Sequence, residues 1–171
     1  MNWTIRRAGW ADAEALALVG AASFLATFAE VHTGVEIAQH CKSEHSVVAY
    51  ERLLQAPADA WLVETTATAA PVGYALLGDA DLPGCRNGDL ELKRIYLLPG
   101  YHGTGAGAEL MQRVLERARE RGAKRLLLGV YSGNARALAY YRKHAFQKIA
   151  DHRFFVGETG YDDVVLALRL E

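Results

Sequence analysis

A strand, a glycine-rich turn and a helix follow one another between residues 90 and 121, and this segment constrains the fold more than any other. Residues 90–98 predict a strand that leads into Pro99-Gly100. Residues 105–121 predict the clearest helix, and Gly122 follows where a left-handed C-terminal cap belongs. The apolar stripe of this helix consists of Leu110, Met111, Val114, Leu115 and Ala118.

The turn between this strand and this helix has the properties of an anion site. Gly103, Gly105 and Gly107 let the backbone approach a phosphate without a Cβ in the way. The N–H groups of the first helical turn and the helix macrodipole favour an anion at the same place. A diphosphate is therefore the ligand that the turn predicts, although a turn without a ligand also needs glycine.

Three kinds of diphosphate site compete for such a turn. A P-loop requires Gly-Lys-Ser/Thr, and no lysine follows these glycines. The spacing Gly103-x-Gly105-x-x-Ala108 superficially matches the motif of a dinucleotide site. That site also needs an acidic residue to hold a ribose, and residues 124–131 contain none. A dinucleotide-dependent oxidoreductase is therefore a remote alternative, and acetyl-CoA is the third candidate ligand.

Two blocks of the sequence resemble the GCN5-related N-acetyltransferase (GNAT) family. Residues 102–107 are similar to the family's cofactor motif Arg/Gln-x-x-Gly-x-Gly/Ala, with His102 in place of Arg or Gln. Residues 134–146 are similar to its Asn-x-x-Ala-x-x-Phe-Tyr-x-x-x-Gly-Phe helix, with Ala145 in place of glycine. Residues 128–131 and 152–155 look most like the bacterial spermidine/spermine acetyltransferase branch.

The resemblance implies a fold and a cofactor site. The fold is a GNAT-type α/β fold, with a central mixed sheet of splayed strands flanked by helices. The pantetheine arm of acetyl-CoA would pair like an added strand with Ile95, Tyr96 and Leu97. Asn134 would contact the cofactor while also capping its helix. The pyrophosphate would lie on the backbone of His102, Gly103, Thr104, Gly105, Ala106 and Gly107.

The resemblance also implies catalytic residues. Acetyl transfer to an amine requires that the amine lose a proton, that an oxyanion be held and that the departing thiolate be protonated. Tyr141 matches the tyrosine that protonates the thiolate beside the cofactor, and the Leu97 N–H would hold the oxyanion. Glu91 matches a general-base position. A regular strand would place it on one face with Lys93, Ile95 and Leu97.

Plainer structural roles compete with these assignments. Tyr141 could pack in its helix beside Tyr140, which we expect in the core. Glu91 could be a solvated or paired charge. One group of metal-type side chains matches no metal-ligand spacing, so no metal is expected: His40, Cys41 and His45.

The remaining pattern predicts a single mixed α/β domain over residues 1–171. Residues 61–65 and 71–77 should form a hairpin, and residues 79–89 a loop. The other expected strands are 3–7, 124–131, 153–156 and 164–170, and the other expected helices are 12–28, 46–55 and 134–144.

Composition bears on the expected partners. The 19 basic and 20 acidic residues give a net charge of -1, which excludes a strong basic field for nucleic acid. The two cysteines share no C-x-x-C spacing, as suits a reducing compartment. Residues 11–29 are interrupted by Asp12, Glu14 and Gly20, so we expect them to be too polar to cross a bilayer. A cytoplasmic protein without a membrane partner is the expectation.

The sequence thus predicts an N-acetyltransferase that moves an acetyl group from acetyl-CoA to a primary amine of a small molecule in a ternary complex. The branch resemblance favours a polyamine acceptor, and a homodimer is an expected assembly. The alternatives are a non-catalytic CoA-binding sensor, acetylation of a peptide or protein amine, and the oxidoreductase.

Overall fold

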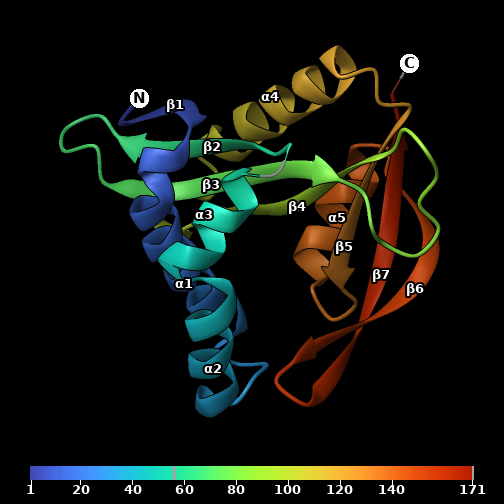
Figure 1. The fold of residues 1–171 in the computed structure, drawn as a ribbon, viewed down its shortest axis with the longest axis horizontal. Helices are drawn as coiled ribbons and strands as arrows, with labels where there is room; N and C mark the ends of the chain where they lie inside the picture. The colour runs from blue at the N-terminus through green and yellow to red at the C-terminus, as the bar shows by residue number, and fades with distance from the viewer. Residues whose placement is uncertain (56, 171) are drawn as a thin grey trace.

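Seven strands form one mixed sheet in the computed structural model, which describes residues 1–55 and 57–170 (Figure 1). Their order across the sheet is β1-β2-β3-β4-β5-β7-β6. Only β4 and β5 are parallel; the other neighbours run antiparallel. The strands are β1 Trp3–Ala8, β2 Asp59–Thr65, β3 Pro71–Asp79, β4 Leu90–Leu97, β5 Arg125–Tyr131, β6 Gln147–Val156 and β7 Thr159–Arg169.

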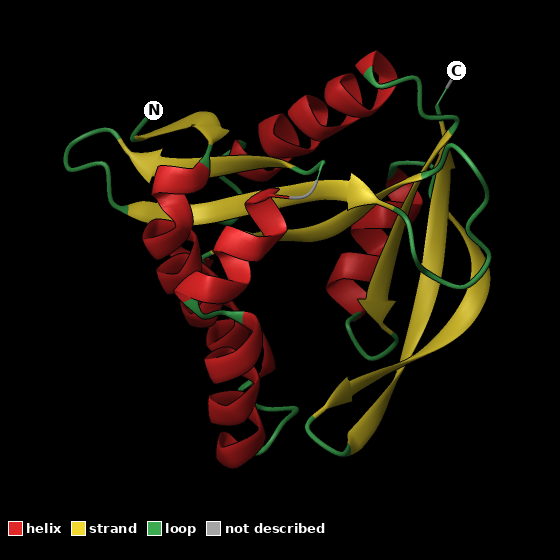
Figure 2. Ribbon diagram, viewed as in Figure 1, coloured by secondary structure: helices red, strands yellow, loops and turns green. Residues whose placement is uncertain are grey.

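Helices cover both faces of the sheet (Figure 2). The helices α1 and α3 bury their apolar side chains against Leu62 and Tyr74 on one face. The helix α4 packs on the other face, against Trp61 and Leu77. The helices are α1 Ala13–Phe28, α2 Gly34–Glu44, α3 Val47–Gln55, α4 Ala106–Glu120 and α5 Ala135–Lys143. The predicted mixed sheet flanked by helices is confirmed.

The parallel strands β4 and β5 pair only at their first residues. Leu90 lies opposite Leu126 and Glu91 opposite Leu127. Beyond these pairs β5 diverges from β4 and takes β7 and β6 with it (Figure 1). The expected splayed strands are therefore present.

A β-bulge in β4 decides which side chains share a face. Leu76 of β3 lies opposite Arg94, whereas the next residue, Leu77, lies opposite Leu92, so Lys93 is an extra residue. Leu92 and Ile95 consequently both pack in the core beneath α4. The prediction that Glu91 and Lys93 share a face with Ile95 and Leu97 is wrong, because it assumed a regular strand.

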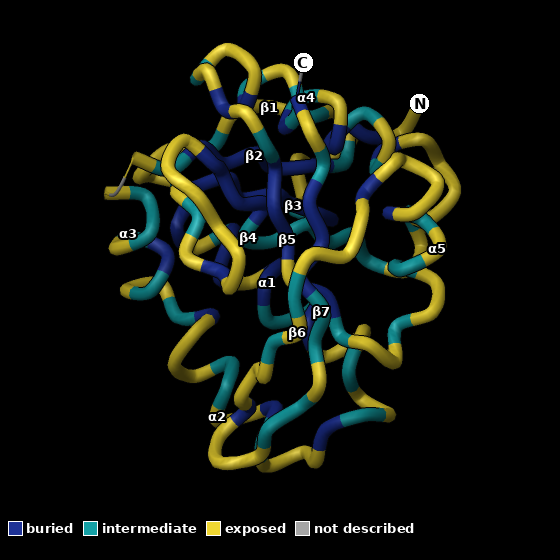
Figure 3. Tube along the Cα trace, turned by 90° about the vertical axis from the view of Figure 1, so that its right-hand side faces the viewer, coloured by how far each residue is buried: buried dark blue, intermediate teal, exposed yellow. Residues whose placement is uncertain are grey.

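Most predicted elements are confirmed within a few residues, and the exceptions are α2, β6 and β7. The helix α2 was not predicted, although Thr33 and Glu36 form a capping box at its start. The strands β6 and β7 begin earlier than expected, at Gln147 and Thr159. None of the residues that the prediction missed in these strands, 147–152 and 159–163, is buried, so no alternating apolar pattern marked them, and α2 is largely exposed as well (Figure 3).

The first long helical segment is apolar enough to cross a membrane by length and composition alone. Residues Trp10–Phe28 reach a mean hydropathy of 1.4, so the prediction that this stretch is too polar is wrong. In the fold, its Leu16 and Val19 pack against Tyr50 and Tyr74. Core helices of folded domains pass the same test, and composition here supports no conclusion about a membrane.

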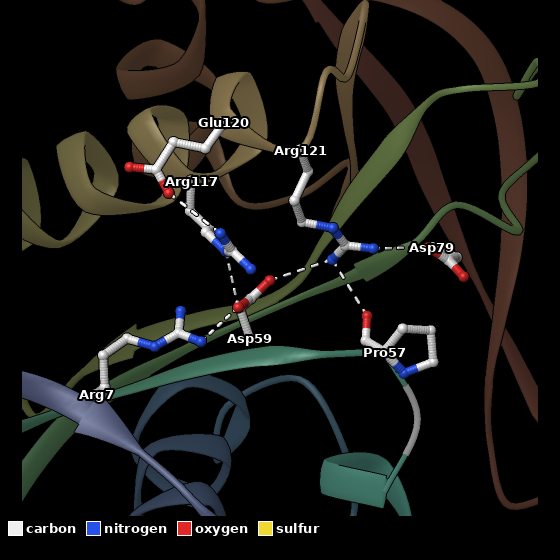
Figure 4. A network of polar contacts seen from close by, with 7 residues as sticks. All are labelled: Arg7, Pro57, Asp59, Asp79, Arg117, Glu120 and Arg121. Atoms are coloured by element: carbon white, nitrogen blue, oxygen red, sulfur yellow. Dashed lines mark hydrogen bonds and ion pairs between the residues drawn. The ribbon is translucent and has the colours of Figure 1, made fainter.

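A buried carboxylate fixes α4 to the sheet. Asp59 at the start of β2 accepts hydrogen bonds from Arg7, from Arg117 Nε at 2.9 Å and from Arg121 at 3.2 Å (Figure 4). Burial raises the pKa of Asp59, but the hydrogen bonds from Arg7 and Arg117 outweigh it and lower the pKa overall. The ionised carboxylate thus holds β1, β2 and the C-terminal end of α4 together, which also sets where the N-terminus of α4 lies.

A chain of hydrogen bonds crosses the second core, beneath α1. His45 Nδ1 lies 2.9 Å from the Tyr50 hydroxyl, which donates to the Tyr74 hydroxyl at 3.1 Å. Gly20 of α1 makes room for this chain. A Cβ at Gly20 would lie within 2.5 Å of His45 Nδ1 and closer still to the Tyr50 hydroxyl.

We predict that Gly20→Ala lowers the free energy of unfolding by about 1–3 kcal/mol, because the added methyl group overpacks a filled site. Replacing glycine in a helix interior normally stabilises by about 0.5–1 kcal/mol. Gly34→Ala at the start of α2 is the matched control, since no heavy atom lies within 4 Å of its Cβ position. Urea unfolding of both variants measures the difference, and a stabilised Gly20→Ala would contradict the packing.

Candidate active site

A cavity of about 1240 Å³ opens where β4 and β5 separate. Its walls come from β4, β5 and α5 on one side and from α1, α2 and the β6–β7 hairpin on the other. Of the predicted site residues, it brings together Glu91, Ile95, Tyr96, Leu97, His102, Gly107, Asn134 and Tyr141. Ligand pockets of proteins are commonly about 300–1,000 Å³, so the cavity can hold two substrates.

The turn before α4 presents unpaired backbone donors. Gly103 and Gly105 have φ angles of +76° and +92°, the left-handed conformation that favours glycine. In the described part of the chain, no hydrogen bond uses the N–H groups of Gly103, Thr104, Gly105 or Gly107. These donors surround the N-terminus of α4, where an anion is favoured. The turn therefore fits a diphosphate.

His102 stabilises this turn through its side chain. Its Nε2 lies 2.9 Å from the Leu97 carbonyl oxygen and its Nδ1 lies 2.8 Å from an Arg136 nitrogen. Because a carbonyl oxygen only accepts, Nε2 carries the proton and Nδ1 accepts from Arg136. Arg136, which no pattern in the sequence marked, brings a cation beside the turn and lines the same cavity.

The backbone of β4 offers hydrogen-bonding groups to the cavity. The Leu98 N–H donates to Val72 of β3 at 2.8 Å. Alternation along an antiparallel strand then points the N–H and C=O groups of Ile95 and Leu97 away from β3, toward the opening to β5. The Leu97 carbonyl is taken by His102, so Leu97 keeps only its N–H for a ligand.

The helix α5 brings Tyr141 and Asn134 to the cavity. Tyr141 is 9% exposed and packs against Phe146, with ring centroids 5.5 Å apart. Burial raises the pKa of Tyr141, so its hydroxyl stays protonated at neutral pH. The Asn134 side chain accepts from the Ala137 N–H at 3.1 Å, which confirms its capping role. The neighbouring Tyr140 is partly buried, and its hydroxyl has no hydrogen-bond partner among the described residues.

Glu91 is paired rather than free. Its Oε2 accepts from Lys93 Nζ at 2.9 Å and from the Asp81 N–H at 3.1 Å. Burial raises the pKa of Glu91, while these two contacts lower it and leave a net rise. The carboxylate lies in the cavity wall, but its hydrogen bonds restrain its orientation.

A second carboxylate, which the sequence analysis did not consider, faces the cavity from β7. Asp163 lies opposite Tyr131 of β5 and opposite His152 of β6. Burial raises the pKa of Asp163 to about 6, while His152 lowers it in part. No hydrogen bond or ion pair of the described residues engages its side chain. No local pattern in the sequence marks Asp163. Its place in the cavity wall follows from its pairing with Tyr131, the last residue of β5, and finding that pair requires the start of β7 to be placed correctly.

The far end of the cavity is aromatic and uncharged. Phe24 stacks on His40 with ring centroids 4.3 Å apart and on His32 at 5.7 Å. Burial lowers the pKa of His32 and His40 and, with the help of Arg94, that of His45 to about 3. The three imidazoles are therefore neutral at pH 7. Among the described residues, no group of three or more His, Cys, Asp or Glu side chains could hold a metal ion.

The fold has a splayed sheet and the site has a turn that fits a diphosphate, and comparison with known proteins identifies the family. The profile of the acetyltransferase (GNAT) family matches residues 23–146. The chain therefore belongs to the GNAT acetyltransferase family. The PaiA N-acetyltransferase from Thermoplasma acidophilum, solved in complex with coenzyme A, has the same fold with a TM-score of 0.79 over 99% of each chain at 19% identity.

Relatives in sequence carry N-acetyltransferase names. An uncharacterized N-acetyltransferase of Mycobacterium tuberculosis is 43% identical over 99 residues, which is 58% of this chain and 60% of that protein. The L-methionine sulfoximine/L-methionine sulfone acetyltransferase of Pseudomonas aeruginosa is 33% identical over 87 residues, 50% of this chain and 49% of that protein. The chain thus spans between about half and two thirds of the length of these curated relatives, neither of which is named as a spermidine/spermine acetyltransferase.

We predict that the Asp163 carboxyl titrates near pH 6 in a carbon-detected NMR titration, because the folded environment penalises its charge. A pKa raised in the folded state means that the native protein binds the extra proton, so this group adds stability as the pH falls from about 7.5 to about 5. Asp163→Asn should therefore have a higher Tm than the wild type at about pH 7.5, and the gap should shrink at about pH 5. A pKa near that of an ordinary aspartate, about 4, would contradict the burial of this group.

Proposed function

We propose that the protein transfers an acetyl group from acetyl-CoA to a primary amine of a small molecule by direct attack in a ternary complex. The observation that carries this proposal is the set of unpaired N–H groups of Gly103, Thr104, Gly105 and Gly107, in a turn whose two ends, His102 and Gly107, line the cavity. Membership of the GNAT family supports acetyl-CoA as the donor, and the coenzyme A bound by the PaiA relative supports it further.

The chain's own groups fit acetyl-CoA, which supplies a thioester carbonyl to be attacked. The N–H groups of Gly103, Thr104, Gly105 and Gly107 would hold the pyrophosphate, and Arg136 would add a cation beside it. The backbone of Ile95 would pair with the pantetheine arm as a neighbouring strand would, which leaves the Leu97 N–H for the thioester carbonyl at the end of that arm. The contact implied for Asn134 completes the proposed cofactor site. The backbone groups of Tyr96 face β3, and the N–H groups of His102 and Ala106 donate to the Pro99 carbonyl and the Thr104 hydroxyl, so these three backbones are not counted in it.

Leu97 and Tyr141 have separate roles in the proposed chemistry. The Leu97 N–H donates to the carbonyl oxygen as negative charge develops there. Tyr141, kept protonated by burial, gives its hydroxyl proton to the sulfur when the C–S bond breaks and the N–C bond has formed.

Two carboxylates in the cavity wall could take the proton of the attacking ammonium. Glu91 is the residue that the family resemblance implies, and it already accepts from Lys93 and from the Asp81 N–H. Asp163 has a pKa of about 6, which keeps it ionised at about pH 7.5 and makes it a stronger base than an ordinary carboxylate. The variants Asp163→Asn and Glu91→Gln distinguish the two carboxylates. Loss of the one that accepts the proton should remove the rise of kcat/KM with pH on the acidic side of the profile, and loss of the other should leave that rise unchanged.

The acceptor is the finer part of the proposal. A polyamine is supported only by the likeness of residues 128–131 and 152–155 to one branch of the family. The Pseudomonas aeruginosa relative is named for acetylating amino-acid analogues. A CoA-binding sensor and a peptide or protein acceptor remain as alternatives. A homodimer and a cytoplasmic location stay predictions of the sequence.

A spectrophotometric assay of CoA release against polyamines, amino acids, aminoglycosides and a lysine peptide tests the proposal. Amine-dependent release with an acetylated product in mass spectrometry is expected. Tight acetyl-CoA binding without turnover of any amine would favour the sensor, and NAD binding without CoA binding would favour the oxidoreductase.

We predict that Gly105→Val weakens CoA binding by at least about tenfold, because a β-branched residue cannot adopt its φ of +92° without moving the turn. The control is Gly100→Val, where the Cβ position has no heavy atom within 4 Å and φ is not positive. Calorimetric titration with CoA measures both. Wild-type affinity in a folded Gly105→Val would rule out the diphosphate turn.

We predict that Tyr141→Phe lowers kcat by about 100-fold or more, with CoA affinity little changed, because it removes one general acid. Tyr140→Phe is the matched control on the same helix. Its hydroxyl is buried without a partner among the described residues, so its loss should not slow turnover. Equal rates for the two variants would remove the acid role of Tyr141.

A further inference from the structure

We call the part of the cavity bounded by α1, α2 and the β6–β7 hairpin the acceptor side. An arginine lines it with most of its N–H donors free of hydrogen bonds to the described residues. Arg94 follows the β4 bulge, and its side chain is 17% exposed. One of its nitrogens donates to the Glu44 carbonyl at 3.2 Å, and another lies 3.8 Å from the Glu44 carboxylate, whose side chain is 52% exposed. A guanidinium has five N–H donors in a fork that matches a carboxylate.

The Arg94 guanidinium is held in place from below. It lies over the Tyr50 ring, 5.1 Å from the ring centroid. Tyr50 is fully buried and is fixed by hydrogen bonds to His45 and Tyr74. A cation stacked on a locked aromatic ring is pre-organised, so little side-chain freedom is lost when it binds a ligand.

The other charges around this half of the cavity pair with one another. Glu91 and Asp81 share Lys93. Glu36 is bound by Thr33 at the start of α2 and by the Tyr161 hydroxyl at 3.2 Å. Two charged side chains among the described residues of this half lack a close ion pair. They are the cation Arg94, whose contact to Glu44 is long at 3.8 Å, and the anion Asp163. Arg94, Tyr96 and Asp163 line the same cavity.

The space beyond these two charges suits an apolar group. It is lined by aromatic rings and by imidazoles that are neutral at pH 7: Phe24, Phe28, His32, His40, Phe154 and Tyr161. A polyamine would bring a second ammonium toward Arg94, whose charge repels it. The carboxylate nearest to Arg94 on this wall, Glu44, already faces Arg94 at 3.8 Å.

We propose that the acceptor is an α-amino acid with an apolar side chain, whose carboxylate is bound by Arg94 and whose amine lies on the Asp163 side. This rests on the proposed N-acetyltransferase function and names its substrate class. The carboxylate forms charge-assisted hydrogen bonds with the guanidinium, and the side chain fills the aromatic end. The carboxylate of Asp163 takes one proton from the ammonium, and the freed amine attacks the thioester carbonyl. As the N–C bond forms and the C–S bond breaks, Tyr141 protonates the sulfur, and the second proton lost by the nitrogen restores the Tyr141 hydroxyl.

The experiment compares amino acids with the same molecules lacking the carboxylate. L-Phenylalanine and L-leucine are assayed against 2-phenylethylamine and isoamylamine, with spermidine as the polyamine. We expect kcat/KM at least about tenfold higher for each amino acid than for its decarboxylated partner, as a charge-assisted pair provides. Arg94→Gln should reduce this preference to less than about threefold through KM, and Arg94→Lys should be intermediate.

Glu44→Gln is the matched control, since it removes the other member of the same ion pair. If Arg94 only tied α2 to β4, Arg94→Gln would lower stability but, like Glu44→Gln, would leave the preference unchanged. The proposal requires that Glu44→Gln keep the preference for the amino acids. Equal or better turnover of spermidine or of the decarboxylated amines by the wild type would overturn the proposal while leaving the N-acetyltransferase function standing.

A binding measurement distinguishes a failure of the Arg94 proposal from a failure of the proposed N-acetyltransferase function. Calorimetric titration of L-phenylalanine into the CoA complex should show binding in the wild type and at least about tenfold weaker binding in Arg94→Gln. Absence of turnover for every amine would refute the proposed function, and this titration would still decide the Arg94 site. No binding of L-phenylalanine, or equal binding by the wild type and Arg94→Gln, would overturn the assignment of Arg94 to the substrate carboxylate.

Discussion

The separation of β4 from β5 is the constraint on which the other features of the site depend. Two residue pairs join these parallel strands, after which the backbone groups of Ile95 and Leu97 face an opening instead of a neighbour. Backbone groups away from water need hydrogen-bond partners. A sheet interrupted in this way therefore offers an extended ligand the contacts that a strand would make, and the turn before α4 provides donors at the end of the same path.

The bulge at Lys93 lets β4 serve the acceptor side as well as the core. Without it, side chains would alternate regularly, and Arg94 would lie on the same face as Leu92, beneath α4. With it, Ile95 stays in the core while Arg94 and Tyr96 face the opposite side, above Tyr50 and Tyr74. One strand thus contributes one face to the core, the other face to the acceptor side, and its free edge to the proposed cofactor.

Much of the cofactor side was predictable because its signals are local. A glycine at positive φ, a helix start and a capping asparagine are written in consecutive residues, and Gly103, Gly105 and Asn134 behave as their neighbours imply. His102 departs from the family motif, and in the structure its ring holds the Leu97 carbonyl and accepts from Arg136. Arg136 went unnoticed because its proximity to the turn depends on how α5 packs.

The sequence by itself determined most of the strands and helices, the glycine-rich turn before α4 and the place of Tyr141 on its helix, since hydrophobic periodicity and glycine conformation act over a few residues. Tertiary structure alone decided the acceptor side. The pairing of Glu91 with Lys93, the face on which Arg94 lies and the burial that raises the pKa of Asp163 all depend on a bulge and on strands that meet from distant parts of the chain. Burial and long-range register have no local signature, because each is a property of the surroundings and not of the residue.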